Sequence, residues 1–373
     1  MIAELTIDLD AIVRNARALA ALVAPARLAA VVKADAYGHG LVPVARALAP
    51  HVDRLCVYAL EEAVALRDAA LDAPLHVLGP VPASDLDVAH AANVALTLWD
   101  DGTYARQAAS VARRRRKPFA VQAKIDTGVA RLGLPYARAG AALAAYAATP
   151  EFDLRGAFTH FAAAEELDSS FTDEQLARFL SAARELGGDI ERHAAATAAA
   201  MLWPQTRLDL VRAGIGLYGI WPSSETELTM RGRGLRLEPA LSWRTRIVAE
   251  HTVDTGGSVG YGRSWRAERP TLVGTLPIGY AEGLPRNAGE AASVLVRGRR
   301  APLIGRVCMD MAFVDLTDVA DAAAGDTVTL IGRDGSDALS ADDLGAACGT
   351  IGYEIVARLP AAVPRRYEGA AAG

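Results

Sequence analysis

The sequence predicts an α/β protein, a (β/α)8 TIM-type barrel followed by a smaller, mostly-β C-terminal domain. Two observations support this prediction. Short apolar runs alternate with helical segments through the first 220 residues or so, and such alternation is typical of a parallel sheet covered by helices. Beyond residue 234 the apolar runs have β-type composition and follow one another closely, which indicates a separate β domain.

Eight candidate strands can be placed in the first region. They span residues 29–33, 54–58, 75–79, 94–98, 119–125, 154–161, 190–196 and 208–214. Alanine-rich segments with helical spacing separate them, for example 61–70 and 173–186. Eight strand–helix units of this length favour a closed barrel over an open sheet. The seventh run, IERHAAATAAA, is also compatible with a helix.

A polar stretch with glycines, SSETELTMRGRG at 223–234, ends the alternation. The β-type runs that follow are LSWRTRIVAEHTV, TLVGTLPIGYA, ASVLVRG, AFVDLT and DTVTLIG, with turn residues between them. We therefore predict two domains, a barrel over residues 1–234 and a β domain over residues 235–373.

Composition and charge exclude several classes of protein. The chain has 373 residues, 51% of them hydrophobic and 22% charged, which is ordinary for a globular protein. A formal net charge of −5 gives no reason to expect a nucleic acid partner. The basic run RRRRK at 113–117 precedes Pro118, and we interpret it as the last turn of a helix, where cations suit the helix dipole.

The cysteines and the N-terminal residues predict a cytoplasmic protein with no membrane partner. Cys56, Cys308 and Cys348 are odd in number and have no CxxC spacing, which favours a reducing compartment. The start, MIAELTIDLD, carries acids where a signal peptide needs basic residues. No uncharged apolar stretch reaches the roughly 18 residues that a membrane span requires.

Lys33 stands at the end of the first candidate strand. In a barrel of this type, side chains at the carboxyl ends of the strands point into the mouth. A lysine in a mostly apolar setting has a lowered pKa and is then competent for Schiff-base chemistry. The alternative is a lysine whose head group reaches solvent, and position alone does not decide between them.

The eighth strand continues into DLVRAGIGLYG, residues 209–219. Arg212 is expected to point into the mouth, while Gly214 and Gly216 leave backbone N–H groups open to a ligand. Loops after the seventh and eighth strands of this fold commonly bind phosphate, and Thr197 adds a hydroxyl there. Two glycines in a tight turn are the alternative. With Lys33, such a site fits pyridoxal 5'-phosphate held as an aldimine.

These segments belong to a longer series of motifs that resembles the alanine racemases, fold type III pyridoxal-phosphate enzymes. The series comprises VVKADAYGHG, AKIDTGVARLG, FTHFA, DLVRAGIGLYG, SVGYGRSW, PIGYAEGLPR, GRVCMDM and IGYEIV, in order along nearly the whole chain. The resemblance implies an isomerase that interconverts L- and D-alanine and supplies D-alanine for peptidoglycan. It also implies a homodimer in which the β domain of one subunit covers the barrel mouth of the other.

The resemblance implies a two-base mechanism. Lys33 serves one face of the substrate Cα, and Tyr261 of the partner subunit serves the other. His160 is implied to hydrogen-bond both Tyr261 and Arg212. Without the resemblance, His160 would be interpreted as a structural histidine and Tyr261 as a turn aromatic.

Two further cationic positions gain roles from the resemblance. Arg212 is implied to donate to the pyridine nitrogen; because an arginine stays charged, the ring nitrogen stays unprotonated, and the weaker electron sink favours racemisation over transamination. Lys124 is implied to be carbamylated and to orient Arg131, which contacts the cofactor's phenolic oxygen and the substrate carboxylate. Without the resemblance, Lys124 pairs with Asp126 or is exposed.

Binding residues are implied in the same way. Those for the cofactor phosphate are Tyr37, Thr197, Gly214, Ile215 and Tyr353. Those along the path of the substrate are Tyr280, Arg286, Arg306 and Met309, whose backbone amide meets the carboxylate. A small pocket of Tyr280, Met309 and Tyr353 admits alanine, and slow activity on serine is expected. Met309 would otherwise be interpreted as a core filler and Tyr280 as a strand aromatic. No metal is implied.

The chain departs from the family at two positions. Ala196-Thr197 stands where an Asn-Ser pair is common, and the lost carboxamide is expected to weaken cofactor retention by about 0.5–1.5 kcal/mol. Ala130 stands where glycine is frequent, and we expect no effect from it. Ala196 leaves room for an alternative, a racemase that accepts serine and alanine. A non-catalytic pyridoxal-phosphate protein is a second alternative, which Tyr261 disfavours.

Overall fold

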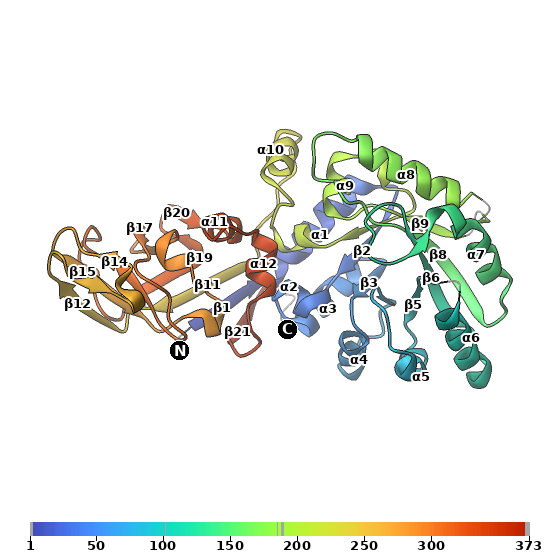
Figure 1. Ribbon diagram of the computed structural model, residues 1–373, viewed down its shortest axis with the longest axis horizontal. Coiled ribbons are helices and arrows are strands. Elements are labelled where there is room, and N and C mark those ends of the chain that lie inside the picture. The colour runs from blue at the N-terminus through green and yellow to red at the C-terminus, as the bar shows by residue number, and fades with distance from the viewer. Residues whose placement is uncertain (1–2, 101, 185, 188–189, 370–373) are drawn as a thin grey trace. The chain divides into compact units, whose positions relative to one another are not determined.

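The computed structural model describes residues 3–100, 102–184, 186–187 and 190–369. Contacts within the chain divide it into two units, whose elements are labelled in Figure 1. The barrel unit consists of Ile12–Ala36 and Leu41–Glu238, and the β unit of Met1–Ala11, Tyr37–Gly40 and Pro239–Gly373.

The barrel unit contains the predicted parallel strands, in the order β10-β2-β3-β4-β5-β6-β8-β9 among the described residues. They are β2 (Arg27–Val31), β3 (Arg54–Val57), β4 (Leu75–Val77), β5 (Ala95–Leu98), β6 (Phe119–Asp126), β8 (Phe152–Phe158), β9 (Glu191–His193) and β10 (Leu210–Ala213). A parallel bridge between Ala196 and Arg212 brings the first and last strands of this order together. The predicted (β/α)8 barrel is therefore confirmed.

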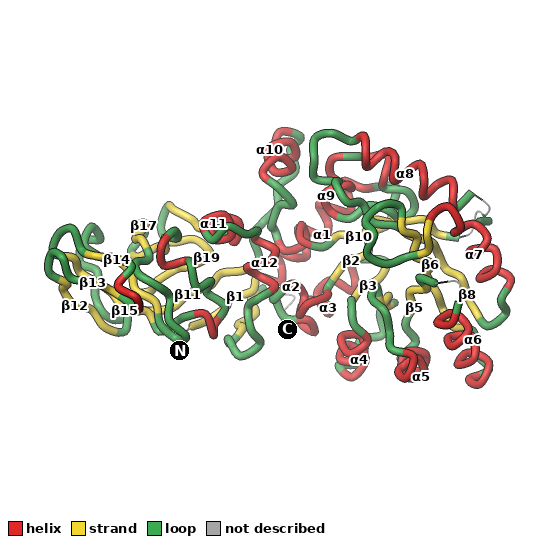
Figure 2. The backbone as a smooth tube through the Cα atoms, viewed as in Figure 1, coloured by secondary structure: helices red, strands yellow, loops and turns green. Residues whose placement is uncertain are grey.

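Helices lie outside these strands, as Figure 2 shows for α4 to α8. The helices of this region are α1 (Leu9–Val23), α3 (Leu41–Leu48), α4 (Leu60–Asp68), α5 (Leu86–Ala91), α6 (Thr103–Arg115), α7 (Tyr136–Ala148), α8 (Ser170–Ala182), α9 (Thr197–Leu202) and α10 (Ser224–Gly232). β3 and β4 are buried along nearly their whole length, because a barrel strand packs against the interior on one face and helices on the other. The ambiguous seventh run is a strand in its first part and a helix, α9, in its last.

The basic run at 113–117 ends a helix, as predicted. α6 stops at Arg115, and Arg116 takes a left-handed conformation after it. Arg113 pairs with Glu151 at 2.6 Å. Arg114 and Arg115 pair with Asp87 at 2.6 and 3.0 Å. The run is therefore an ion-paired face of the barrel's outer layer.

The β unit is mostly β, as predicted. Its largest sheet has the order β17-β16-β19-β11-β1-β21, with β20 beside β19; two smaller sheets are β12-β15-β18 and β13-β14. The strands are β1 (Ala3–Asp8), β11 (Leu241–Arg246), β12 (Ala249–Val253), β13 (Ser258–Val259), β14 (Trp265–Arg266), β15 (Thr271–Leu276), β16 (Ser293–Val296), β17 (Arg299–Pro302), β18 (Ala312–Asp315), β19 (Thr327–Asp334), β20 (Asp337–Leu339) and β21 (Arg365–Glu368). Its helices include α11 (Ala341–Ala347) and α12 (Gly352–Ala357).

The first strand of the chain belongs to this β unit. β1 pairs antiparallel with β11 and parallel with β21. Its burial alternates, with Ala3, Leu5 and Ile7 buried, so the period-two pattern that marks a strand was present in the sequence. At the other end, the barrel unit runs to Glu238, four residues beyond the predicted boundary at 234.

Among the described residues, no helix combines the length and the apolar composition needed to cross a membrane.

Candidate active site

Lys33 follows β2 at the carboxyl end of the barrel strands. β2 ends at Val31, and the Lys33 side chain is half-buried with its Nζ 6.0 Å from the ring centroid of Tyr58. Burial lowers the pKa of Lys33, the cation of Arg131 lowers it further, and the carboxylate of Glu62 raises it. A lowered pKa leaves more of the amine neutral at a given pH, which is the state that forms a Schiff base.

The backbone after Lys33 turns in the left-handed sense. Within α2 (Lys33–Tyr37), the φ angles of Ala34, Asp35 and Ala36 are 54°, 53° and 53°. For residues with a Cβ this conformation costs roughly 1–2 kcal/mol each, so neighbouring groups must hold it. The Ala34 N–H donates to Glu62 Oε1 at 2.6 Å, and the Leu41 N–H donates to Asp35 Oδ1 at 2.7 Å. The sequence analysis did not anticipate this turn.

The chain contains only three lysines, Lys33, Lys117 and Lys124. Lys117 is exposed and its Nζ donates to Asn93 Oδ1 at 2.9 Å. Lys33 and Lys124 are therefore the two lysines that can face the barrel mouth.

Lys124, near the end of β6, is 8% exposed. Burial lowers its pKa to about 8, with further lowering by Arg131 and Arg212. Asp126 Oδ1 accepts the backbone N–H groups of Gly128, Val129 and Ala130 at 3.0 to 3.1 Å. The Asp126 carboxylate thus organises the loop that leads to Arg131, and its charge also raises the pKa of Lys124 against the effects of burial and of the two arginines.

Arg131 itself is exposed on this loop. With Lys124, Thr159 and His160 it lines one hollow at the ends of β6 and β8. The structure therefore brings together around this hollow three barrel residues that were expected in the site, Lys124, Arg131 and His160.

Arg212, on β10, is the buried cation of the barrel interior, at 4% exposure. Its Nη1 donates to His193 Nδ1 at 2.7 Å, and its Nη2 donates to the carbonyls of Thr159 and Ala194 at 2.7 and 2.9 Å. Burial lowers its pKa to about 10, so the guanidinium stays charged near neutral pH. The three hydrogen bonds, to His193, Thr159 and Ala194, fix the plane of the guanidinium group.

His160 follows β8 and lies 3.5 Å from Arg212, measured from Nδ1 to Nη2. Burial and then Arg212 lower the pKa of His160 to about 3. The ring is therefore neutral near pH 7, and its Nδ1 accepts from the arginine. The expected pairing of His160 with Arg212 is present at the long limit of a hydrogen bond.

Two buried amides hold these groups from behind, and the sequence analysis missed both. Gln175 Nε2 on α8 donates to Thr127 Oγ1 and to the His160 carbonyl, both at 3.1 Å. Gln122 Oε1 on β6 lies 3.1 Å from His193 Nε2. Since His193 Nδ1 accepts from Arg212, its Nε2 carries the proton and donates to Gln122. An amide on a strand or helix has no sequence signal for such a role.

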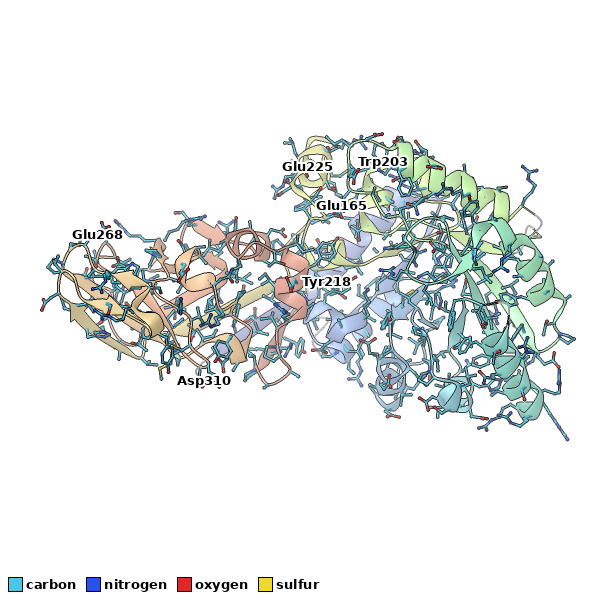
Figure 3. The ribbon with its side chains drawn as sticks, in the orientation of Figure 1. Glu165, Trp203, Tyr218, Glu225, Glu268 and Asp310 are labelled. Atoms are coloured by element: carbon cyan, nitrogen blue, oxygen red, sulfur yellow. The ribbon has the colours of Figure 1, made fainter. Side chains whose placement is uncertain are left out.

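The turn after β10 is η4 (Ile215–Tyr218). The Gly214 N–H donates to Thr197 Oγ1 at 3.0 Å. The prediction that this N–H is open to a ligand is therefore wrong. The N–H groups of Ile215 and Gly216 begin the turn, where amides have no partner within their own helix. Tyr218, labelled in Figure 3, closes the turn by donating its hydroxyl to the Val31 carbonyl at 3.0 Å.

This arrangement fits pyridoxal phosphate. A Cβ on Gly216 would lie 2.8 Å from Thr197 Cγ2, so only glycine lets the turn approach the Thr197 hydroxyl. Amides and a hydroxyl suit a phosphate, and a fixed guanidinium suits an acceptor on the ring. A lysine whose pKa is lowered by burial suits the aldehyde. Lys33, Thr197, Arg212 and the η4 amides would hold the group.

The remaining expected site residues lie in the β unit. Tyr261, in η5 (Tyr261–Arg263), is 70% exposed. Tyr280 begins η6 (Tyr280–Glu282) and is 44% exposed, and Met309 is 56% exposed. The alternatives of a core methionine and a strand aromatic are therefore wrong. Tyr37 and Tyr353 have ring centroids 6.4 Å apart.

Ala130 has a left-handed backbone conformation, which the sequence does not predict. Its φ is 55°, a conformation that glycine adopts without cost. We expect Ala130→Gly to raise the free energy of unfolding by about 0.5–1 kcal/mol, because the strain relieved exceeds the entropy that glycine loses. Urea unfolding measures this change. Ala144→Gly, on the exposed face of α7, is the control and should lower stability by about 1 kcal/mol. A loss of stability in both variants would contradict the expectation.

Three buried histidines predict acid sensitivity. Burial is the main cause that lowers the pKa of His76, His160 and His193, whereas an unfolded histidine has a pKa near 6.5. Unfolding therefore takes up protons below pH 6.5. The stability that these groups contribute is complete above pH 6.5 and is lost as pH falls toward the lowered values, by about 1.4 kcal/mol per pH unit for each histidine.

Urea unfolding between pH 4 and 7 measures this loss. His76→Gln should reduce the slope of stability against pH by the contribution of one proton. Equal slopes for the wild type and His76→Gln would show that His76 is not held neutral by the fold.

Comparisons with known proteins identify the family of this chain. The family descriptions "Alanine racemase, N-terminal domain" and "Alanine racemase, C-terminal domain" match residues 7–222 and 240–367. An alanine racemase of Desulforamulus reducens is 40% identical over 370 residues, which is 97% of this chain and 98% of that protein. One of Symbiobacterium thermophilum is 38% identical over 97% of this chain and 96% of that protein.

Solved structures lead to the same family. The crystal structure of alanine racemase from Bacillus anthracis with bound L-Ala-P has a TM-score of 0.90 and 34% identity, over 99% of this chain and 96% of that one. The biosynthetic alanine racemase of Pseudomonas aeruginosa has a TM-score of 0.86 and 37% identity, over 98% and 99%. With both family domains matched in order along the chain, this protein belongs to the alanine racemase family of pyridoxal-phosphate-dependent racemases.

Proposed function

We propose that this chain interconverts L- and D-alanine, with Lys33 and Tyr261 as the acid/base groups on opposite faces of the substrate Cα. The observation that carries the proposal is the group of Lys33, Lys124, His160 and Arg212 at the carboxyl ends of the barrel strands. Racemisation needs one group to remove the Cα proton and a second to return a proton from the other side.

Pyridoxal phosphate, when bound, accepts the electron pair left behind when the Cα proton leaves. Lys33 anchors the cofactor and, once released from it, holds or gives up a proton at its Nζ. The lowered pKa of Lys33 supports this role, because burial and the charge of Arg131 make the neutral, proton-accepting amine easier to form than in an exposed lysine. Tyr261, at its exposed turn, serves the second face through its hydroxyl.

Arg212 sets the strength of the electron sink. It is charged near neutral pH and only donates hydrogen bonds, so an acceptor opposite it stays unprotonated. His160 is neutral beside the arginine. It can therefore accept a hydrogen bond from Arg212 without adding positive charge to the site. Together they favour return of the proton to Cα.

Substrate binding rests on Arg131 and on the Met309 backbone amide, which meet the carboxylate. Tyr280, Met309 and Tyr353 limit the size of the side chain. Exclusion of one methylene by an apolar pocket is worth about 1–3 kcal/mol, so serine and 2-aminobutyrate are expected to turn over slowly. Tyr37, Thr197, Gly214, Ile215 and Tyr353 serve the phosphate, with Gly214 acting through the Thr197 hydroxyl.

We also propose a homodimer in the cytoplasm that supplies D-alanine for peptidoglycan. In this dimer the β unit of one subunit covers the barrel unit of the other and brings Tyr261 to it. The exposure of Tyr261, Tyr280 and Met309 supports an interface on the β unit. Reduced thiols at Cys56, Cys308 and Cys348 support a reducing compartment.

A racemisation assay over a panel of L-amino acids tests the proposed activity. L-Alanine should be converted to D-alanine fastest, with serine and 2-aminobutyrate at least about tenfold slower in kcat/KM. Equal rates on serine and alanine would favour the broader racemase. Cofactor binding without conversion of any substrate would favour the non-catalytic protein.

Lys124 is proposed to be carbamylated. A lysine with a pKa of about 8 is roughly one-tenth neutral at pH 7, and the neutral amine adds carbon dioxide. The addition forms a nitrogen–carbon bond and releases one proton from the nitrogen to solvent, and the product is a carbamate anion, which relieves the cation cluster of Arg131 and Arg212. Native mass spectrometry in bicarbonate should find the mass of one added carbon dioxide on Lys124, lost on acidification and absent from Lys117. Only unmodified Lys124 under these conditions would rule the proposal out.

A further inference from the structure

We propose that Glu62 is a positioning residue for Lys33, which clamps the left-handed turn after it to the end of the neighbouring strand. Glu62 lies in the first turn of α4, and none of the family motifs noted in the sequence includes it. The inference rests on the proposed role of Lys33 and names the group that holds this lysine in place.

One carboxylate joins the ends of two barrel strands. Glu62 Oε1 accepts the N–H of Ala34 at 2.6 Å, in the turn that follows β2. Its Oε2 accepts the N–H groups of Tyr58 and Ala59 at 2.8 and 3.1 Å, directly after β3. The second set of bonds is an ordinary cap at a helix start. The first reaches 28 residues back along the chain, to the residue next to Lys33.

The left-handed turn requires such a clamp. Ala34, Asp35 and Ala36 all have φ near +53° and none of them is glycine, so the turn persists only while its surroundings hold it. Two further bonds act at its far end, from Ala36 N–H to the Val32 carbonyl and from Leu41 N–H to Asp35 Oδ1. At its near end, Glu62 holds the exposed Ala34 and thereby the backbone of Lys33.

Glu62 also sets the charge around the lysine. The groups that interact with Lys33 electrostatically are Arg131 and Lys124 at the β6 side, His160 at the β8 side, Glu62 on α4 and the ring of Tyr58 after β3. With Lys124 unmodified, Arg131 and Lys124 are cationic groups and His160 is neutral, so Glu62 is the anion of the set; the carbamylation proposed above would add a second anion at Lys124. It raises the pKa of Lys33 against the effects of burial and Arg131. Loss of its charge therefore favours the neutral amine.

The test uses Glu62→Gln in the cofactor-free protein, with Glu61→Gln as the matched control. Glu61 stands next to Glu62 in the same helix turn and is exposed. Because the chain has three lysines, acylation followed by peptide mass spectrometry reports Lys33, Lys124 and the exposed Lys117 separately. Hydrogen exchange of peptides that contain Ala34 reports the turn itself.

For Glu62→Gln we expect the midpoint of the pH dependence of Lys33 acylation to move to lower pH, while that of Lys117 stays. Exchange at Ala34 should speed up about tenfold or more, since a hydrogen bond to a charged acceptor is lost. In the loaded enzyme kcat should fall at least about tenfold, with KM for alanine changed little. Glu61→Gln should leave the acylation midpoints, the exchange at Ala34, kcat and KM unchanged.

Two results would overturn the proposal. If exchange at Ala34 speeds up without a shift in Lys33 acylation, Glu62 holds the turn but has no effect on the lysine, and its role as a positioning residue for Lys33 is refuted. If neither changes, the clamp is absent. Glu62→Asp, which keeps the charge but is too short to reach both strand ends, should keep the acylation midpoint and still speed exchange at Ala34. Since these readouts need no cofactor, they stay distinct from a failure of the proposed racemisation, which the alanine assay of the wild type reports.

Discussion

Replacing Lys33 by alanine is expected to abolish covalent retention of pyridoxal phosphate and to lower racemisation by at least about 10⁴-fold. The substitution removes both the cofactor anchor and one of the two acid/base groups, and an acid/base group alone contributes typically 10²–10⁴-fold. Borohydride reduction followed by peptide mass spectrometry should find the cofactor on the Lys33 peptide of the wild type and on no peptide of the variant.

Lys117→Ala is the control for this experiment, because Lys117 is an exposed lysine on the outside of the barrel. It should retain the cofactor and full activity. A variant lacking Lys33 that carries the cofactor on Lys124, the other buried lysine, would show that the anchor has been assigned to the wrong strand.

Tyr261→Phe is expected to leave the cofactor content unchanged and to slow racemisation about 10²–10⁴-fold, because only the hydroxyl that serves the second face is lost. Lys33 should still exchange the Cα proton of one alanine enantiomer with solvent deuterium, without inversion. Tyr136→Phe removes the hydroxyl of another exposed tyrosine, on α7, and should change neither rate. Unchanged turnover in both directions for Tyr261→Phe would refute the two-base proposal.

Mixing the two inactive variants tests whether Tyr261 acts on the partner subunit. In a dimer of Lys33→Ala with Tyr261→Phe, one of the two sites combines an intact Lys33 with an intact Tyr261 from the other chain. Random exchange of subunits makes half of the dimers mixed, so about one quarter of the wild-type activity should return. If Lys33 and Tyr261 worked within one chain, no mixed dimer would have an intact site and no activity would return.

The sequence alone determined the barrel and its order of strands. Each barrel strand is a short apolar run because it is buried on both faces, and each is separated from the next by a helix. This pattern is local, so it can be interpreted without knowing what packs against it. Lys33 and Arg212 were identifiable for the same reason: in a barrel the end of a strand is the mouth, and their positions at strand ends follow from the strand assignments.

The sequence carried less information about the place of the first strand, β1, in the fold. β1 has a clear alternation, but its partners, β11 and β21, lie more than 230 residues away in the chain. A strand pattern states that one face is buried and does not state against what. The tertiary pairing therefore decided that these first residues belong with the C-terminal unit.

The hydrogen bonds that hold the site residues in place, and the charges of those residues, are visible only in the tertiary structure. The Thr197 hydroxyl accepts the hydrogen bond of the Gly214 N–H, which the sequence predicted to be available to a ligand. Ala130 and Ala34 adopt left-handed backbone conformations, which cannot be predicted from the residue type because alanine rarely adopts them. Glu62, Gln175 and Gln122 look like ordinary polar residues until they meet backbone or side-chain groups from other strands. Residue types record what a group can do. Its pKa and its hydrogen-bond partners depend on burial and on charges brought close by folding, and these belong to the assembled barrel.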